Sequence, residues 1–392
     1  MRKLWQQLGI ATNWPVLVAV AVLAALGNIS IWAHFPPDGT KQCVFLGVSV
    51  VCMGLFQAVN YQRIGRWAWP FYVLSLLLIL YTVIGAKFGG IPGVHYVNGA
   101  YAWITFSGFS LEPAELMKIA YVLVLARYLR FRSNYRTLVG LLPPFAVTLI
   151  PVALILKQPD LGMALLFIPA LFTMLFAAGA RIKHLVMVAA MGVAISPVLW
   201  FSGPPPDGPG LPVLKHFPVF VKGYQRQRVF ALFRRDPQTM RATAYQTQHA
   251  LTAFASGGTT GKGAAVIPVG RTVPEAHNDM IFALIGEQFG FVGSAVVLGS
   301  FLVLFAAGIE IAAATKEPFG RLIAVGIVAM LAAQAFVNLM VMLRLMPVTG
   351  ITLPFVSYGG SSLVCSFMAV GLLLNVGQNR PLVIAREAFE FE

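Results

Sequence analysis

Residues 161–179 read LGMALLFIPALFTMLFAAG, a run that contains no charged side chain. The hydrocarbon core of a bilayer is about 30 Å thick, and a helix needs roughly 20 apolar residues to cross it. Because backbone N–H and C=O groups cannot stay unpaired in lipid, such a run must be helical. Similar runs recur along the chain. The ten predicted spans lie near residues 15–33, 43–59, 68–86, 112–130, 138–156, 161–179, 185–201, 279–311, 322–343 and 357–376.

The composition excludes a water-soluble enzyme. Of the 392 residues, 58% are apolar and 11% are charged, whereas soluble domains have about 45–50% and about 25%. Disorder is excluded as well, since it requires low hydrophobicity. Cys43, Cys52 and Cys365 lie in apolar runs at unrelated spacings, which argues against a disulfide framework and a cysteine zinc site. We therefore expect an all-α fold, a polytopic transmembrane helical bundle that forms one domain over residues 1–392.

The distribution of Lys and Arg sets the expected orientation of this bundle. With the N-terminus in the cytoplasm, the short inward segments hold 14 Lys and Arg and the short outward segments hold 4. Both termini are therefore expected to be cytoplasmic. The net charge of +14 is explained by this topology together with one basic external loop, so no nucleic-acid partner is expected.

That loop is residues 203–276, a large extracytoplasmic segment between spans seven and eight. It begins with a Pro/Gly run at 203–210, which cannot be helical. Residues 217–233 alternate apolar and basic side chains, Arg226 and Arg228 among them, and predict an amphipathic helix in the headgroup region. The loop would attract an anionic headgroup or a pyrophosphate. Simple attraction to anionic lipid is an equally good explanation.

Ionisable side chains inside spans are costly and by default mark function. Glu112, Glu115 and Lys118 share one helical face at the outward end of the fourth span. They either form a neutralising Glu115–Lys118 pair or face a cavity, where Lys118 holds a phosphate oxygen. Asp160 follows Gln158-Pro159 and suits a helix N-cap, which favours a structural role.

Polar and ionisable groups are concentrated just before the eighth span. Asn278 or Asp279 could cap that helix, but the segment from Glu275 to Asp279 carries more such groups than capping requires. His277 beside Asp279 suggests an acid/base or metal-adjacent pair.

Two glycine-rich segments are expected near the same outward face. Residues 256–263 lack the P-loop spacing and follow no strand, which argues against nucleotide binding. Residues 354–362 open the tenth span. Their small side chains permit close helix packing, or they form an irregular turn that lines a cavity.

Together these motifs resemble the SEDS family of shape, elongation, division and sporulation proteins (RodA, FtsW, SpoVE). The resemblance runs from about residue 60 to about residue 380. Lys157 and the segment Pro347–Gly350 look most like the elongation branch, that of RodA. The matching motifs stand at Glu112–Lys118, Gln158–Gly162, Tyr224–Arg228, Asp236-Pro237, Tyr245-Gln246, Ser256–Gly263, Pro274–Ala283 and Pro354–Ser362.

The resemblance implies a peptidoglycan glycosyltransferase that polymerises lipid II at the outer face of the bacterial cytoplasmic membrane during elongation. Its implied partner is a class B penicillin-binding protein, a transpeptidase. Asp279 matches the family's essential aspartate, and we expect it to act as general base on the acceptor hydroxyl. Lys118, Arg226 and Arg228 are candidates for stabilising the leaving pyrophosphate. The other expected substrate-binding residues are Glu115, Asp160, His277, Ser357, Tyr358, Gly359, Gly360 and Ser361.

The chain departs from the family pattern at three positions. Ala102 replaces a usual arginine, Glu112 a usual glutamine and Gln288 a usual glutamate. These changes weaken the local positive field that would bind the pyrophosphate. Lys118 or a divalent cation is expected to compensate for the lost positive charge. No other cofactor is expected. Two alternative functions stay open, a lipid II flippase and a non-catalytic activator of a penicillin-binding protein. Few polar groups lie deep in the spans, which argues against the flippase.

Overall fold

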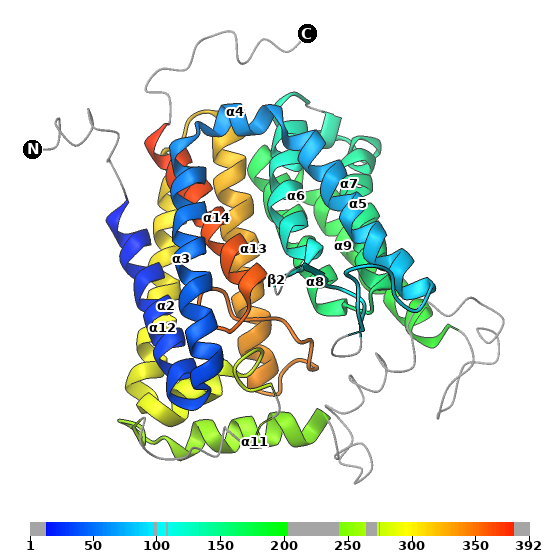
Figure 1. Cartoon of the computed structure of the whole chain (residues 1–392). Helices are drawn as coiled ribbons and strands as arrows, with labels where there is room; N and C mark the ends of the chain where they lie inside the picture. Colours follow the sequence, from blue (N-terminus) through cyan, green and yellow to red (C-terminus); the bar gives the residue numbers. More distant parts are fainter. Residues whose placement is uncertain are drawn as a thin grey trace, which may run out of the picture.

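The structure is a computed structural model that describes residues 13–96, 100–106, 109–132, 134–202, 243–263, 273 and 275–379. In this part of the chain the long helices run side by side as a bundle (Figure 1). They are α2 (Trp14–His34), α3 (Pro36–Ala58), α5 (Ala68–Lys87), α6 (Pro113–Arg130), α7 (Leu142–Lys157), α8 (Leu161–Ala178), α9 (Ile182–Phe201), α12 (Ile281–Ala314), α13 (Pro318–Met342) and α14 (Gly360–Gln378).

Short elements mark the two ends of this bundle. The short helix α4 (Tyr61–Arg66) lies across one end and α11 (Thr243–Ser256) across the other, and we call these the α4 end and the α11 end (Figure 1). Helix α2 begins toward the α4 end of the bundle, and α14 ends there (Figure 1). Two 3-10 turns, Asn134–Arg136 and Val139–Leu141, precede α7.

Each of the ten predicted spans overlaps one of the long helices, and the helical fold class is confirmed. Among the described residues, eight helical segments are long and apolar enough to cross a membrane. The other two are α6, which carries four charged side chains, and α9, whose apolar part is Ile182–Val198. The number of spans therefore stays a prediction, as does the orientation.

Two span boundaries differ from expectation in an informative way. The second span was expected from residue 43, but α3 begins at Pro36, because proline fits the first turn of a helix. The eighth span was expected as one helix over 279–311. Instead α12 is interrupted at Gly290, whose φ of 65° and ψ of −157° are not helical. Its two parts are therefore separate helical pieces.

Local side-chain chemistry explains several helix ends. The Asp160 carboxylate accepts a hydrogen bond from the Met163 N–H at 2.8 Å and caps α8, as the sequence predicted. Glu317 caps α13 in the same way, through the Gly320 N–H at 2.7 Å. Gly179 ends α8 in the left-handed region that favours glycine.

The helices pack around α13 and α14. Helix α14 lies against α3, α13 lies against α8 and α6, and α12 lies against α2. Helix α9 is different: within residues 182–198 Leu185 is the one buried side chain, and most of its apolar side chains are exposed. In a membrane these side chains would face lipid or a partner.

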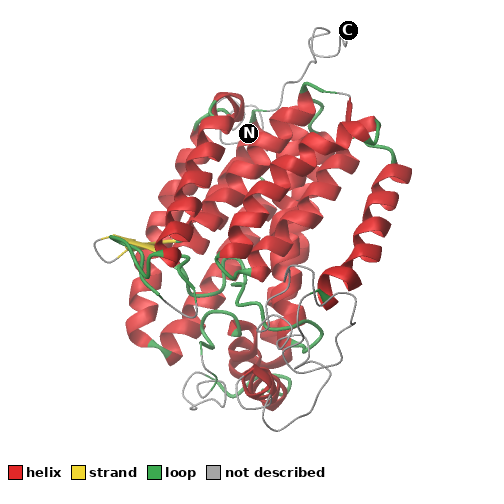
Figure 2. Ribbon diagram, turned by 90° about the vertical axis from the view of Figure 1, so that its right-hand side faces the viewer, coloured by secondary structure: helices red, strands yellow, loops and turns green. Residues whose placement is uncertain are grey.

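A short β-hairpin departs from the all-α expectation. Strands β1 (Ile104–Phe106) and β2 (Phe109–Leu111) pair antiparallel, with Thr105 opposite Ser110. Figure 2 shows them as a small element at the side of the helical bundle. The hairpin leads directly into α6 and so helps to set where that helix begins.

Candidate active site at the α11 end

Asp279 lies at the α11 end, in the turn before α12, and is 7% exposed. Its carboxylate oxygen Oδ1 accepts a hydrogen bond from Gln246 Nε2 of α11 at 3.2 Å. Its backbone carbonyl accepts one from Asn338 Nδ2 of α13 at 2.8 Å. The residue before α12 is Met280, and Asn278 donates its amide to Glu275 instead of capping the helix. Asp279 is thus held by two other helices.

His277 connects this turn to the segment before α14. Its backbone carbonyl accepts a hydrogen bond from the Tyr358 N–H at 2.8 Å. Its ring centroid lies 4.7 Å from that of Phe35 and 5.3 Å from that of Tyr358. The motifs Pro274–Ala283 and Pro354–Ser362, which are far apart in the chain, are therefore in contact through His277 and Tyr358.

The segment 351–359 is irregular, as one of the two alternatives for residues 354–362 predicted, and the cavity that it was expected to line stays a prediction. The Ser357 hydroxyl accepts a hydrogen bond from the Leu353 N–H at 2.8 Å, and Gln42 Nε2 donates to the Ser357 carbonyl at 3.1 Å. The Ser361 hydroxyl donates to the Ser110 carbonyl at 2.6 Å. A Cβ on Gly360 would lie 3.1 Å from the Phe45 ring, so small residues are needed there too.

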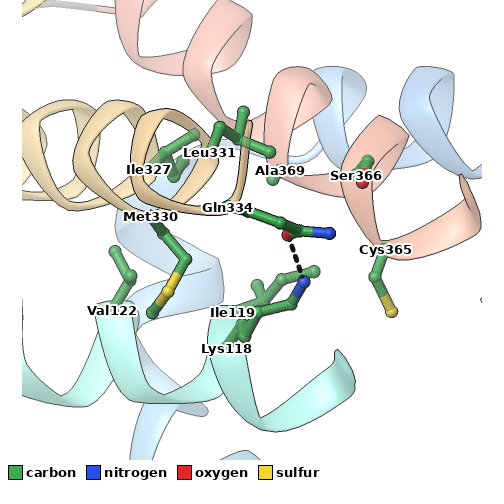
Figure 3. Close-up of a pocket in the computed structure, with 10 residues that line it drawn as sticks. All are labelled: Lys118, Ile119, Val122, Ile327, Met330, Leu331, Gln334, Cys365, Ser366 and Ala369. Carbon is green, nitrogen blue, oxygen red and sulfur yellow. Dashed lines mark hydrogen bonds between the residues drawn. The ribbon is translucent and has the colours of Figure 1, made fainter. Parts of the chain in front are cut away.

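Glu115 and Lys118 form the neutralising pair that was one of the two expectations for them. Lys118 Nζ lies 2.6 Å from Glu115 Oε2, and the two side chains are 7% and 2% exposed. Lys118 also donates to Gln334 Oε1 at 2.7 Å, as Figure 3 shows. A small cavity of about 20 Å³ lies beside this pair, walled by Met330, Cys365 and other side chains.

Glu112 lies directly before the first residue of α6. Its backbone N–H donates a hydrogen bond to the Ser361 hydroxyl at 3.1 Å. This contact joins the start of α6 to the start of α14.

The glycine-rich segment 257–263 fills the interruption of α12. The Phe291 N–H donates to the Gly258 carbonyl at 2.9 Å, and the Lys262 N–H donates to the Glu287 carbonyl at 3.0 Å. Lys262 Nζ also lies 2.7 Å from the carboxylate of Glu287, which is fully buried. The segment thus replaces hydrogen bonds that the break at Gly290 removes, which is a structural use of its glycines.

A large apolar groove runs along the bundle between α8, α12 and α13. Its volume is about 1090 Å³. Aliphatic and aromatic side chains and one threonine line it, among them Pro169, Thr173, Phe301, Phe305, Ala329 and Ala333. A groove of this size and chemistry suits a long hydrocarbon chain.

Several expectations concern residues outside the described part of the chain. Arg226, Arg228 and the amphipathic helix expected over 217–233 all lie there. Ala102, at the position of the missing arginine, is buried. Within the described residues, no three His, Cys, Asp or Glu side chains are grouped as metal ligands. The divalent cation therefore stays a prediction.

Two residues that hold this site together were not singled out from the sequence: Gln334 and Asn338. A signal for both existed, since they are polar side chains one turn apart inside an otherwise apolar span. Gln246 belongs to the motif Tyr245-Gln246, but its contact with Asp279 could not be predicted, because that contact depends on how α11 folds across the bundle.

Comparisons with known proteins agree with this picture. The model of the cell cycle protein family FtsW/RodA/SpoVE matches residues 6–381. The stage V sporulation protein E of Bacillus subtilis is 32% identical over 379 residues, covering 93% of this chain and 94% of that protein. A probable peptidoglycan glycosyltransferase FtsW of Trichlorobacter lovleyi is 35% identical, covering 86% of this chain and 82% of that protein.

Solved structures are similar as well. A chain from a structure described as a peptidoglycan synthase complex that coordinates polymerization and crosslinking superimposes with a TM-score of 0.78 at 31% identity, covering 95% of this chain and 100% of that one. The rod shape determining protein RodA of Thermus thermophilus gives a TM-score of 0.65 at 28% identity, covering 95% of this chain and 98% of that one.

Proposed function

The chain belongs to the FtsW/RodA/SpoVE family, also called the SEDS family, and on this premise we propose that it is a peptidoglycan glycosyltransferase that polymerises lipid II. The observation that carries the proposal is the position of Asp279, whose carboxylate is bonded by α11 and whose backbone carbonyl is bonded by α13, next to the irregular segment 351–359. Three separate parts of the chain meet there, as a site for two large substrates requires. The sequence relatives named above carry the FtsW and sporulation names.

The proposed reaction joins the 4-hydroxyl of an acceptor sugar to the anomeric carbon of a donor. The acceptor oxygen forms the new glycosidic bond as the bond between the anomeric carbon and the pyrophosphate oxygen breaks. A hydroxyl is a weak nucleophile, so its proton must leave as the bond forms. Asp279 takes this proton as general base, which typically contributes about 10²–10⁴-fold to a rate. The electron pair of the broken bond leaves with the undecaprenyl pyrophosphate.

Positive charge is needed to stabilise that leaving group. We assign this role to Arg226 and Arg228 of the long loop, together with Lys118. Lys118 is nearly enclosed and paired with Glu115, so it would act on the pyrophosphate from beneath the surface rather than as a free surface cation. Glu115, Asp160, His277 and the segment 357–361 would orient the two headgroups around Asp279.

The prenyl tail of the lipid-linked donor is proposed to lie in the apolar groove between α8, α12 and α13. The nearly all-apolar lining of this groove supports the assignment. The tail would stay in hydrocarbon while the headgroup reaches the α11 end. In this arrangement the α11 end faces outward from the cytoplasmic membrane, and both termini are in the cytoplasm.

We further propose that the enzyme acts in the elongation branch with a class B penicillin-binding protein as partner. Lys157 and the segment 347–350 support the elongation assignment, as does the likeness to a RodA structure. The likeness to a chain of a peptidoglycan synthase complex supports the partner. Rescue of rod shape, but not of septation, in cells that lack the endogenous elongation enzyme would support this branch.

Polymerisation of labelled lipid II by the purified protein, with and without the transpeptidase, tests the proposed activity. Glycan strands are the expected product. In proteoliposomes, transfer of lipid II from the inner to the outer leaflet without polymer would instead support a flippase. Stimulation of a transpeptidase by a protein that makes no polymer itself would support a non-catalytic activator.

A further inference from the structure

Two buried amide side chains lie one turn apart on α13. Gln334 is 0% exposed and Asn338 is 1% exposed. A spacing of four residues places both on the same face of the helix. Burying an amide side chain costs free energy unless its N–H and C=O groups are hydrogen-bonded. The hydrogen-bond partners of these two side chains therefore show which segments this face of α13 binds.

Asn338 uses its amide nitrogen twice. Nδ2 donates to the Asp279 carbonyl at 2.8 Å and to the Ile351 carbonyl at 2.7 Å. One acceptor belongs to the turn that carries the proposed general base, and the other begins the irregular segment before α14. The Asn338 side chain therefore connects two loops of the candidate active site through its two N–H groups.

Gln334 makes the corresponding contacts one turn away. It accepts a hydrogen bond from Lys118 Nζ at 2.7 Å and donates to the Thr352 carbonyl at 3.0 Å. Thr352 in turn lies 2.7 Å from Ser362, hydroxyl to hydroxyl. Adjacent carbonyls of the same segment, those of Ile351 and Thr352, are thus each held by one amide of α13.

We propose that Asn338 is a positioning residue for Asp279, and that Gln334 and Asn338 together fix the spacing between Asp279, the segment 351–359 and Lys118. This inference rests on the proposed function, because it assigns Asn338 its effect through the general base. The physical reason is that Asp279 lies in the turn before α12, where the Asn338 amide holds its backbone carbonyl at 2.8 Å. Displacing a reacting group by about 1 Å can lower a rate by about 10²-fold.

The replacement Asn338→Asp tests this directly. It keeps the size and shape of the side chain but removes both N–H donors, leaving oxygen facing the carbonyls of Asp279 and Ile351. We expect kcat for lipid II polymerisation to fall by about 10²-fold. KM for lipid II should change little, because Asn338 itself is buried and is not proposed to touch substrate.

The matched control is Asn375→Asp on α14. Asn375 is also 0% exposed, and its Nδ2 donates to the carbonyls of Phe56 at 2.8 Å and Gln57 at 3.0 Å. These contacts lie at the α4 end, away from Asp279. We expect this variant to lose thermal stability comparably to Asn338→Asp and to keep the wild-type kcat.

Asn338→Ser serves if Asn338→Asp does not fold. The serine hydroxyl retains one hydrogen-bond donor, so we expect kcat to fall less than in Asn338→Asp, which lacks both N–H donors. A wild-type kcat in a folded Asn338→Asp or Asn338→Ser variant would overturn the inference, and so would an equal loss of kcat in Asn375→Asp.

Asp279→Asn, measured in the same assay, separates this inference from the proposed function. If Asp279→Asn is inactive while the Asn338 variants are fully active, only the positioning role is wrong. If Asp279→Asn polymerises at the wild-type rate, the proposed function and the positioning role fall together.

Discussion

Lys118 illustrates how much one residue's environment decides its role. Its ammonium lies in a nearly closed site against Glu115 and Gln334. Removing one partner of a buried ion pair leaves an uncompensated charge, at a cost of about 3–5 kcal/mol, whereas replacing both partners is often neutral. The pair is thus expected to matter for stability whether or not Lys118 acts on the pyrophosphate.

We therefore predict that Lys118→Met lowers the free energy of unfolding by about 3–5 kcal/mol, and that Glu115→Gln with Lys118→Met recovers much of it. Unfolding in detergent measures both effects. Lys41→Met is the control, because Lys41 forms a 3.4 Å pair with Asp38 while its side chain is 63% exposed, and exposed pairs contribute about 0–1 kcal/mol. A double variant that folds but makes no polymer would support a role for the Glu115–Lys118 pair in transfer; full activity would contradict the roles proposed for both residues.

At the scale of elements, the interruption of α12 is the feature with the clearest consequence. Gly290 adopts a conformation that is essentially restricted to glycine, and a Cβ there would lie 2.4 Å from the Gly261 nitrogen. The segment 257–263 occupies the break and also pairs with Glu287 through Lys262. The first part of α12, which follows Asp279, is thus fixed by a distant glycine-rich loop.

Gly290→Ala should lower stability by about 1–3 kcal/mol through overpacking, and polymerisation should fall with it because the turn before α12 loses its support. Gly299→Ala is the control in the same helix, since nothing lies within 4 Å of a Cβ there. Alanine should be neutral or favourable by about 0.5–1 kcal/mol at that helical position. Equal melting temperatures for the two variants would contradict this account of the break.

The sequence was sufficient to locate the long helices, because apolar length alone distinguishes them from the connections. It also identified Asp279, His277 and the segment 354–362, which the fold brings to one end. It could not predict the break at Gly290, whose hydrogen bonds come from the segment 257–263. The sequence did not indicate the role of Asn338 for a similar reason. That role depends on Asp279 and Ile351 lying against the same face of α13, which is a tertiary contact.

At the scale of the whole molecule, the groove between α8, α12 and α13 is the feature to test. Ala333→Phe should fill part of it and raise KM for a long-chain lipid II, with little effect on a short-chain analogue whose tail does not reach the groove. The expected effect is about 15- to 60-fold, since excluding two or three methylene groups costs about 0.8 kcal/mol each and about 1.4 kcal/mol corresponds to tenfold.

Val193→Phe on α9 is the control for this prediction, because Val193 is 72% exposed and does not line the groove. It should leave both substrates unaffected. If Ala333→Phe lowers activity equally on long and short tails, the groove does not hold the prenyl chain.

The proposed function as a whole depends on Asp279 accepting a proton from the acceptor hydroxyl. The most direct measurement is the initial rate of polymerisation of labelled lipid II by purified Asp279→Asn, compared with Asp38→Asn, which makes the same change at an exposed ion pair. We predict that Asp279→Asn loses about 10²–10⁴-fold in rate while keeping its melting temperature, and that Asp38→Asn polymerises as the wild type does. Glycan strands formed by Asp279→Asn at the wild-type rate would contradict the account.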